Sequence, residues 1–297
     1  MKIDMLGTGA AMIDPDRMQS GILVTLENGA KYMFDCGAGT IHNMVRANSS
    51  PAEVGVVFLT HLHHDHICDF PLFAINGWMY DRPDAPIVLG PKGTKHFCDH
   101  LFEGGAFDAD FRARSDYPRR QRNLDAVRPD VREVSPGLAY EDENVKIYCD
   151  FVEHIPREIS ECFGIRMEAE GKVIAFSGDT SPCDNMVKLA KDADVLFHEC
   201  TFPESFIEFR SKSGTGTHAH TPPTALGKIA VDAGVKNLVA THFGHFESTN
   251  KSLQKAAVNH MPVEEMGPHV MDEVVRDIRR NYRGPLQMAY DLLRIDV

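Results

Sequence analysis

Residues Thr60–His66 constrain this 297-residue chain more than any other stretch. They read THLHHDH and follow the apolar run Val54–Leu59, whose length and β-branched content indicate a buried strand. Imidazole nitrogens and carboxylate oxygens are ligands that Zn²⁺ takes where cysteine is absent. Close spacing on a turn also lets side chains reach two neighbouring points. The stretch therefore predicts half of a two-metal site rather than a solvated histidine-rich loop.

The composition is that of a globular protein without a membrane segment. Hydrophobic residues make up 43% and charged residues 25%, and no apolar run approaches membrane-spanning length. The seven cysteines are odd in number and irregular in spacing, which favours a reducing, cytoplasmic location over a disulfide framework. The net charge of −12 disfavours non-specific binding of nucleic acid, because such binding depends on lysine and arginine.

Other candidate ligands also stand just after predicted strands. His154 follows the run Val145–Val152, Asp179 follows Lys172–Phe176, and His242 follows 237–240. Ligands held at strand ends share one edge of a sheet, so they can converge. A lone buried histidine is more often structural than a ligand, but the repeated position at strand ends favours ligands here.

These motifs resemble those of the metallo-β-lactamase superfamily, whose signature H-x-H-x-D-H follows a strand. Within the superfamily the chain looks most like the ribonuclease Z and arylsulfatase-like branch, since L-G-T-G at 6–9, D-C-G-A-G-T at 35–40 and H-E-C-T-F at 198–202 recur in that order. The resemblance implies an α/β fold, an αββα sandwich of two mixed β-sheets flanked by helices. It also implies one domain over 1–297, with a lid-like insertion at about 92–132 and a C-terminal helix and strand at about 262–297.

The resemblance further implies two Zn²⁺ ions, for which Mn²⁺ or Fe²⁺ can substitute. His61, His63 and His154 would bind the first ion; Asp65, His66 and His242 would bind the second; Asp179 would bridge them. Asp35, His198 and Glu199 would support these ligands, although Asp35 could equally cap the helix that starts near Thr40.

Two residues are candidates for proton transfer. Asp65 could shuttle the proton of the attacking water. His220 aligns with a family histidine, and we expect a neutral ring there because a helix follows, with Thr221 as its N-cap and Pro222 in its first turn. A neutral His220 would assist the leaving group or the developing oxyanion.

The last strand is expected over 286–297.

The chain also departs from the ribonuclease Z pattern. His64 replaces a small residue and is expected to be either a bystander or a group that supports the ligands, and Phe243–Phe246 replaces F-S-x-R-Y. Only 24 residues separate His154 from Gly178, which leaves no room for the arm with which ribonuclease Z grips transfer RNA. The arginines of 112–132 alternate with acids, which predicts a mixed-charge surface. Most of 70–80 is expected to be a helix packed on the sheet, although Trp78 and Tyr80 could instead line a substrate pocket, for which His218 and His245 are further candidates.

Three functions remain open at this stage. The first is a dinuclear zinc hydrolase that cleaves a small, anionic ester (a phosphodiester, sulfate ester or lactone) by attack of a metal-bridging hydroxide. The second is a ribonuclease Z-type endonuclease that processes the 3′ end of transfer RNA, which the net charge makes the less favoured partner. The third is a non-hydrolytic metal-binding oxidoreductase or sensor. A homodimer is compatible with each.

Overall fold

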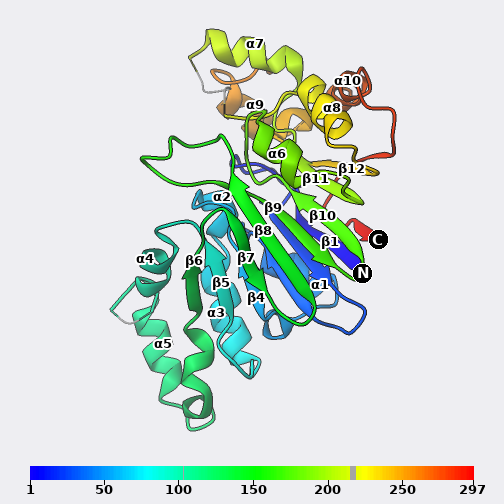
Figure 1. Cartoon of the computed structure of the whole chain (residues 1–297). Coiled ribbons are helices and arrows are strands. Elements are labelled where there is room, and N and C mark those ends of the chain that lie inside the picture. Colours follow the sequence, from blue (N-terminus) through cyan, green and yellow to red (C-terminus); the bar gives the residue numbers. More distant parts are fainter. Residues whose placement is uncertain (103, 215–218) are drawn as a thin grey trace. The chain divides into compact units, whose positions relative to one another are not determined.

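The computed structural model describes residues 1–102, 104–214 and 219–297. By its contacts the chain divides into two compact units, each built around one seven-stranded mixed sheet. Unit 1 comprises 1–7, 18–135 and 291–297, and unit 2 comprises 8–17 and 136–290. Figure 1 labels many of the helices and strands of both. The assignment of the whole chain to one domain stays a prediction.

The sheet of unit 1 has the order β14-β1-β2-β3-β4-β5-β6, in which β3 to β6 run parallel. Its strands are β1 Lys2–Gly7, β2 Gly21–Thr25, β3 Lys31–Phe34, β4 Val56–Phe58, β5 Ile87–Gly90, β6 Asp130–Glu133 and β14 Arg294–Asp296. The helices are α1 Thr40–Arg46, η1 Pro51–Glu53, α2 His64–Ile67, α3 Phe70–Met79, α4 Thr94–Asp99, α5 Asp108–Ser115 and η2 Arg120–Val127.

The sheet of unit 2 has the order β13-β12-β11-β10-β9-β8-β7, in which β10 to β13 run parallel. Its strands are β7 Gly137–Glu141, β8 Val145–Phe151, β9 Phe163–Ala169, β10 Lys172–Phe176, β11 Val195–Glu199, β12 Leu238–Thr241 and β13 Leu286–Met288. The helices are α6 Asp184–Leu189, α7 Glu204–Lys212, α8 Pro223–Asp232, η3 His245–Glu247, α9 Lys251–Ala257 and α10 Val270–Ile278.

Apolar side chains explain why the parallel strands form. Parallel strands are covered on both faces, so they read as continuous apolar runs. Every residue of β4 and of β11 is buried, and all of β4 and the first three residues of β11 are apolar. The carboxyl ends of parallel strands meet at one edge of a sheet. The loops after β3 and β4 therefore lie at one edge of unit 1, and those after β10, β11 and β12 at one edge of unit 2.

The segment 92–132 is an integral part of unit 1 rather than a detached insertion. It supplies β6 to the sheet and buries Phe111, Ala126 and Val127 in the core. The expected mixed-charge surface is present, since Arg112, Arg114, Arg128 and Arg132 each pair with a nearby aspartate.

The end of the chain differs from the expected single strand. Residues 286–297 form two short strands in different sheets: β13 pairs with β12, and β14 pairs with β1. Leu292 between them has a φ of 66°, a left-handed conformation that interrupts an extended strand. Within the described residues, no helix has the length and apolar character needed to cross a bilayer.

Candidate metal centre

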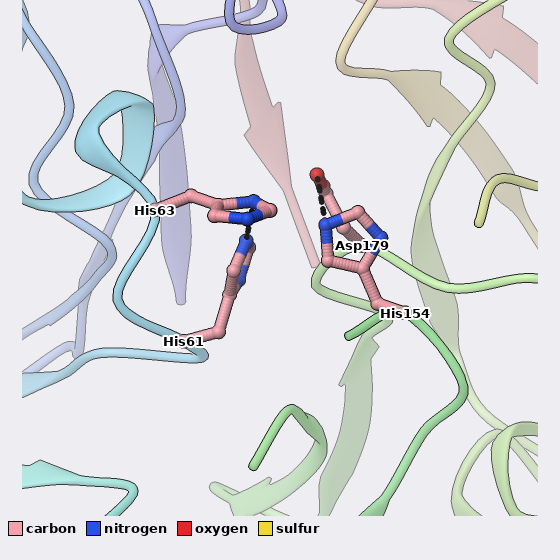
Figure 2. A group of neighbouring side chains, drawn as sticks. All are labelled: His61, His63, His154 and Asp179. Atoms are coloured by element: carbon pink, nitrogen blue, oxygen red, sulfur yellow. Dashed lines mark hydrogen bonds and ion pairs between the residues drawn. The ribbon is translucent and has the colours of Figure 1, made fainter. Parts of the chain in front are cut away.

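The loop after β4 and the short helix α2 that follows it carry the unit 1 cluster, which we define as His61, His63, Asp65 and His66. The rings of His61 and His63 point toward each other, with Nε2 of His61 3.1 Å from Nδ1 of His63 (Figure 2). Nε2 of His66 lies 3.5 Å from Oδ2 of Asp65. His61, Asp65 and His66 are at most 1% exposed, whereas His63 is exposed. Nitrogen and oxygen donors packed this closely in the interior suit a bound cation.

Asp35 fixes this loop from the end of β3. Its carboxylate accepts hydrogen bonds from the backbone N–H and the hydroxyl of Thr60 at 2.8 and 3.0 Å, and from Nδ1 of His66 at 2.7 Å. The bond to Nδ1 directs the Nε2 atom of His66 toward Asp65, the arrangement in which carboxylates orient metal-binding histidines. The alternative prediction, that Asp35 caps the helix near Thr40, was wrong, because the amide of Ile41 at the start of α1 donates to Asp69 instead.

The unit 2 cluster, His154, Asp179 and His242, is built in the same way. Nε2 of His154 lies 3.6 Å from Oδ2 of Asp179 (Figure 2), and Nε2 of His242 lies 3.3 Å from Oδ1. Nδ1 of His154 donates to the carbonyl of Ala219, at 2.8 Å. Burial lowers the pKa of His154, which favours the neutral ring that binds metals. His242 has a φ of 57°, a conformation that costs energy and recurs at functional sites.

Glu199, at the end of β11, lies behind this cluster. It is 1% exposed and accepts hydrogen bonds from the backbone N–H groups of Thr180, Thr201 and Thr221 at 3.1–3.2 Å. It therefore ties together the loop that follows Asp179, its own loop and the loop before α8. The expectation that Glu199 supports the ligands agrees with these contacts.

His220 is held by Glu199 through a contact of 3.0 Å between Nδ1 and Oε1. Burial alone would lower the pKa of His220, but the carboxylate outweighs it and raises the pKa to about 9. The expected neutral ring is thus wrong for the metal-free chain, because the facing carboxylate decides the charge. Thr221 is also not the N-cap of α8; Pro222 occupies that position, and the Thr221 hydroxyl donates to the carbonyl of Thr180.

The remaining candidates divide into several groups. His198 is fully buried and donates Nδ1–H to the carbonyl of Glu199 at 2.8 Å, which suits a supporting role. His64 is 64% exposed at its side chain, as expected of a bystander. His245 is 2% exposed, and Tyr80 is 58% exposed at the end of α3. His218 lies outside the described residues.

Trp78 is corrected from a pocket residue to a core residue. It is 1% exposed and packs against Phe111, with ring centroids 5.4 Å apart. The indole therefore offers no surface to a substrate, and its role is to fill the core of unit 1.

Sequence reasoning missed the threonines that surround the ligands. Thr60 bonds Asp35, and the Thr201 hydroxyl contacts His242 at 3.0 Å and donates to Glu199 at 2.8 Å. A signal was available, because a threonine directly precedes or follows five of the candidates: Thr60 precedes His61, Thr180 follows Asp179, Thr217 precedes His218, Thr221 follows His220 and Thr241 precedes His242.

The donors fit divalent metal ions. His66, His154 and His242 each have Nδ1 engaged by an oxygen, and each has Nε2 directed at a carboxylate of the same cluster. Imidazole and carboxylate without thiolate suit Zn²⁺, Mn²⁺ and Fe²⁺.

Comparisons with known proteins identify relatives over most of the chain. Residues 1–212 match the family described as anti-Pycsar protein Apyc1. A ribonuclease Z from Mycobacterium marinum is 30% identical over 250 residues, covering 82% of this chain and 86% of the relative.

Solved structures share the fold. The metallo-β-lactamase fold protein YhfI from Bacillus subtilis matches with a TM-score of 0.70 at 17% identity, covering 99% of both chains. The short form of human tRNase Z matches with a TM-score of 0.69 at 20% identity, covering 100% of this chain and 99% of the other. The predicted fold class, two mixed sheets flanked by helices, and the predicted class of metal-dependent hydrolase are confirmed. The chain therefore belongs to the ribonuclease Z branch of the metallo-β-lactamase superfamily, and to the family described as anti-Pycsar protein Apyc1.

Proposed function

We propose that the unit 1 and unit 2 clusters together hold two Zn²⁺ ions and that the protein hydrolyses phosphodiester bonds. His61, His63 and His154 would bind the first ion, Asp65, His66 and His242 the second, and Asp179 both. The observation that carries the proposal is a build common to both clusters, in which Nδ1 of His66, His154 and His242 contacts an oxygen and Nε2 faces a carboxylate.

The metal ions would lower the pKa of a bound water and would place positive charge beside the attacked phosphorus. Asp65, buried beside His66, is the proposed acceptor of the water's proton. His220 is the proposed general acid. With Nδ1 held by Oε1 of Glu199, Nε2 of a protonated ring is the atom that would give its proton to the leaving oxygen.

The names of the relatives support a phosphodiester rather than a sulfate ester or a lactone. Ribonuclease Z and tRNase Z are both named for RNA, whose backbone is linked by phosphodiesters. They favour the ribonuclease alternative over the small ester expected from the sequence. Precursor transfer RNA is accordingly the first candidate substrate. Nothing in them supports an oxidoreductase or a sensor.

A small phosphodiester is the second candidate, favoured by the residues between the two ligands His154 and Asp179. Residues 155–178 form a loop followed by the hairpin β9–β10, with no arm for gripping RNA. The net charge of −12 also opposes binding of a polyanion. Ion pairs with aspartates further occupy the arginines Arg112, Arg114, Arg128 and Arg132.

One assay tests whether the protein hydrolyses phosphodiester bonds and distinguishes the two candidate substrates. The zinc-loaded protein is given bis(4-nitrophenyl) phosphate, 4-nitrophenyl sulfate, a lactone and precursor transfer RNA at matched, physiological salt. We expect hydrolysis of the phosphodiesters, abolished in Asp179→Ala, and little of the other two. Faster, site-specific cleavage at the 3′ trailer would select the ribonuclease, and a higher kcat/KM on the small diester would select the second candidate. If neither phosphodiester is cleaved, the proposal fails.

A further inference from the structure

The hydroxyl of Thr201 contacts three functional groups of unit 2. Oγ1 lies 2.8 Å from Oε2 of Glu199, 3.0 Å from Nδ1 of His242 and 3.1 Å from Nδ1 of His220. Thr201 is 2% exposed, so bulk water does not compete for these contacts. Thr201 therefore contacts both a proposed metal ligand, His242, and the proposed acid, His220.

The proton count fixes the direction of each hydrogen bond. A hydroxyl has one proton and two acceptor lone pairs, and an ionised carboxylate only accepts. Glu199 already accepts from three backbone N–H groups, as an ionised carboxylate does, so it also takes the hydroxyl proton of Thr201. Oγ1 must then accept from Nδ1–H of both histidines, with the proton of His220 shared with Oε1 of Glu199.

We infer that Thr201 is a positioning residue that sets the Nδ1–H tautomer of His242 and joins this ligand to the Glu199–His220 pair. Nε2 of His242, 3.3 Å from Asp179, is thereby kept as the metal-binding nitrogen, and Nε2 of His220 is kept for the leaving group. The inference rests on the proposed function, in which His242 is a ligand and His220 the acid.

The same contacts argue against a different use of these residues. Donor atoms of Glu199, His220 and His242 lie within 4.8 Å of one another, a spacing that would also suit a metal ion. However, Glu199 already accepts from three backbone N–H groups, the Thr201 hydroxyl and His220. An ion there would have to displace these buried bonds, so the group is better described as a hydrogen-bond network.

The test compares Thr201→Val with Thr201→Ser. Valine keeps the shape and removes the hydroxyl, whereas serine keeps the hydroxyl and removes the methyl group. Zinc affinity is measured by competition with a chromogenic chelator, and kcat is measured on the phosphodiester. We expect Thr201→Val to lower the affinity for one of the two zinc ions by about 10- to 100-fold and to lower kcat, because a group that orients a ligand is lost. Thr201→Ser should retain both the zinc affinity and kcat. Thr94→Val, which removes another buried threonine hydroxyl, bonded to the carbonyl of Pro91, is the control for stability.

Wild-type zinc affinity and kcat in the valine variant, or equal losses in the valine and serine variants, would overturn the inference and leave the proposed function standing. Failure of the wild-type protein to bind zinc would instead overturn the proposed function. Where the valine variant does not fold, nitrogen-15 NMR of the metal-free wild-type protein decides. It should show protonated Nδ1 in both His220 and His242, and a protonated Nε2 with bare Nδ1 in His242 would contradict the inference.

Discussion

At the scale of single residues, carboxylates and hydroxyls behind the ligands determine what the histidines can do. Asp35 orients His66 in unit 1, and Glu199 with Thr201 orients His220 and His242 in unit 2. The proposed ligands could be named from the motifs, because few other uses exist for such residues at strand ends, and their assignment stays a prediction. The charge of His220 was not, because it depends on a carboxylate 21 positions away in the sequence.

Substitutions of Asp179 and of His220 should have different effects on metal binding and on proton transfer. Asp179 faces the Nε2 atoms of two proposed ligands, so Asp179→Ala should lose at least one metal ion and nearly all activity. His220→Ala should keep both ions and lose about 10²–10⁴-fold in kcat, the range for an acid or base. Elemental analysis and steady-state kinetics check both. Loss of metal from the His220 variant would reassign that residue as a ligand.

The His220–Glu199 pair should also make the metal-free protein pH-sensitive. The pKa of His220 is raised from 6.5 to about 9 on folding, so its stabilising effect is complete below about pH 6.5 and is lost as pH rises toward 9. Burial lowers the pKa of His154, His198 and His245, so above about pH 7.5, one unit beyond the pKa of an unfolded histidine, these rings are neutral in both states and add no slope.

Urea unfolding in the presence of a chelator measures this effect. The free energy of unfolding should fall between pH 6.5 and 9 in the wild-type protein, and the slope should flatten in His220→Gln. An equal slope in the two proteins would show that the pair does not titrate in this range.

At the scale of elements, the sequence predicted the strands that precede the candidate ligands but not the close approaches between segments. These strands were expected from apolar patterning, and β4, β8, β10 and β12 are present. The reason for glycine in D-C-G-A-G-T was not visible. A Cβ at Gly37 would lie 2.1 Å from the carbonyl oxygen of Asp65, so the loop after β3 can approach the unit 1 cluster only without a side chain.

Gly37→Ala should therefore displace the backbone of Asp65. We expect a destabilisation of about 1–3 kcal/mol, as for other overpacked sites, and weaker zinc binding. Gly55→Ala is the matched control, because a Cβ there would have no neighbour within 4 Å. Urea unfolding and zinc competition compare the two. Equal behaviour of the two variants would mean that the loop moves aside at no cost.

At the scale of the whole molecule, we propose that each metal ion takes ligands from both units. Family motifs in the sequence predicted the superfamily, the fold class and the hydrolase class, because they carry the chemistry that defines the family. They did not predict the substrate, since the metal-binding motifs serve the reacting group and not the rest of the molecule that bears it. The names of the relatives and the short segment at 155–178 favour different substrates.

Zinc stoichiometry in four proteins tests the sharing of ligands most directly: the wild type, His63→Ala in unit 1, His154→Ala in unit 2, and the double variant. If both residues bind the same ion, the wild type should hold two zinc ions per chain and each single variant one. The double variant should also hold one, because the second substitution removes nothing further. A double variant with no zinc, from single variants that each retain one, would show that each unit carries its own ion and would contradict the account.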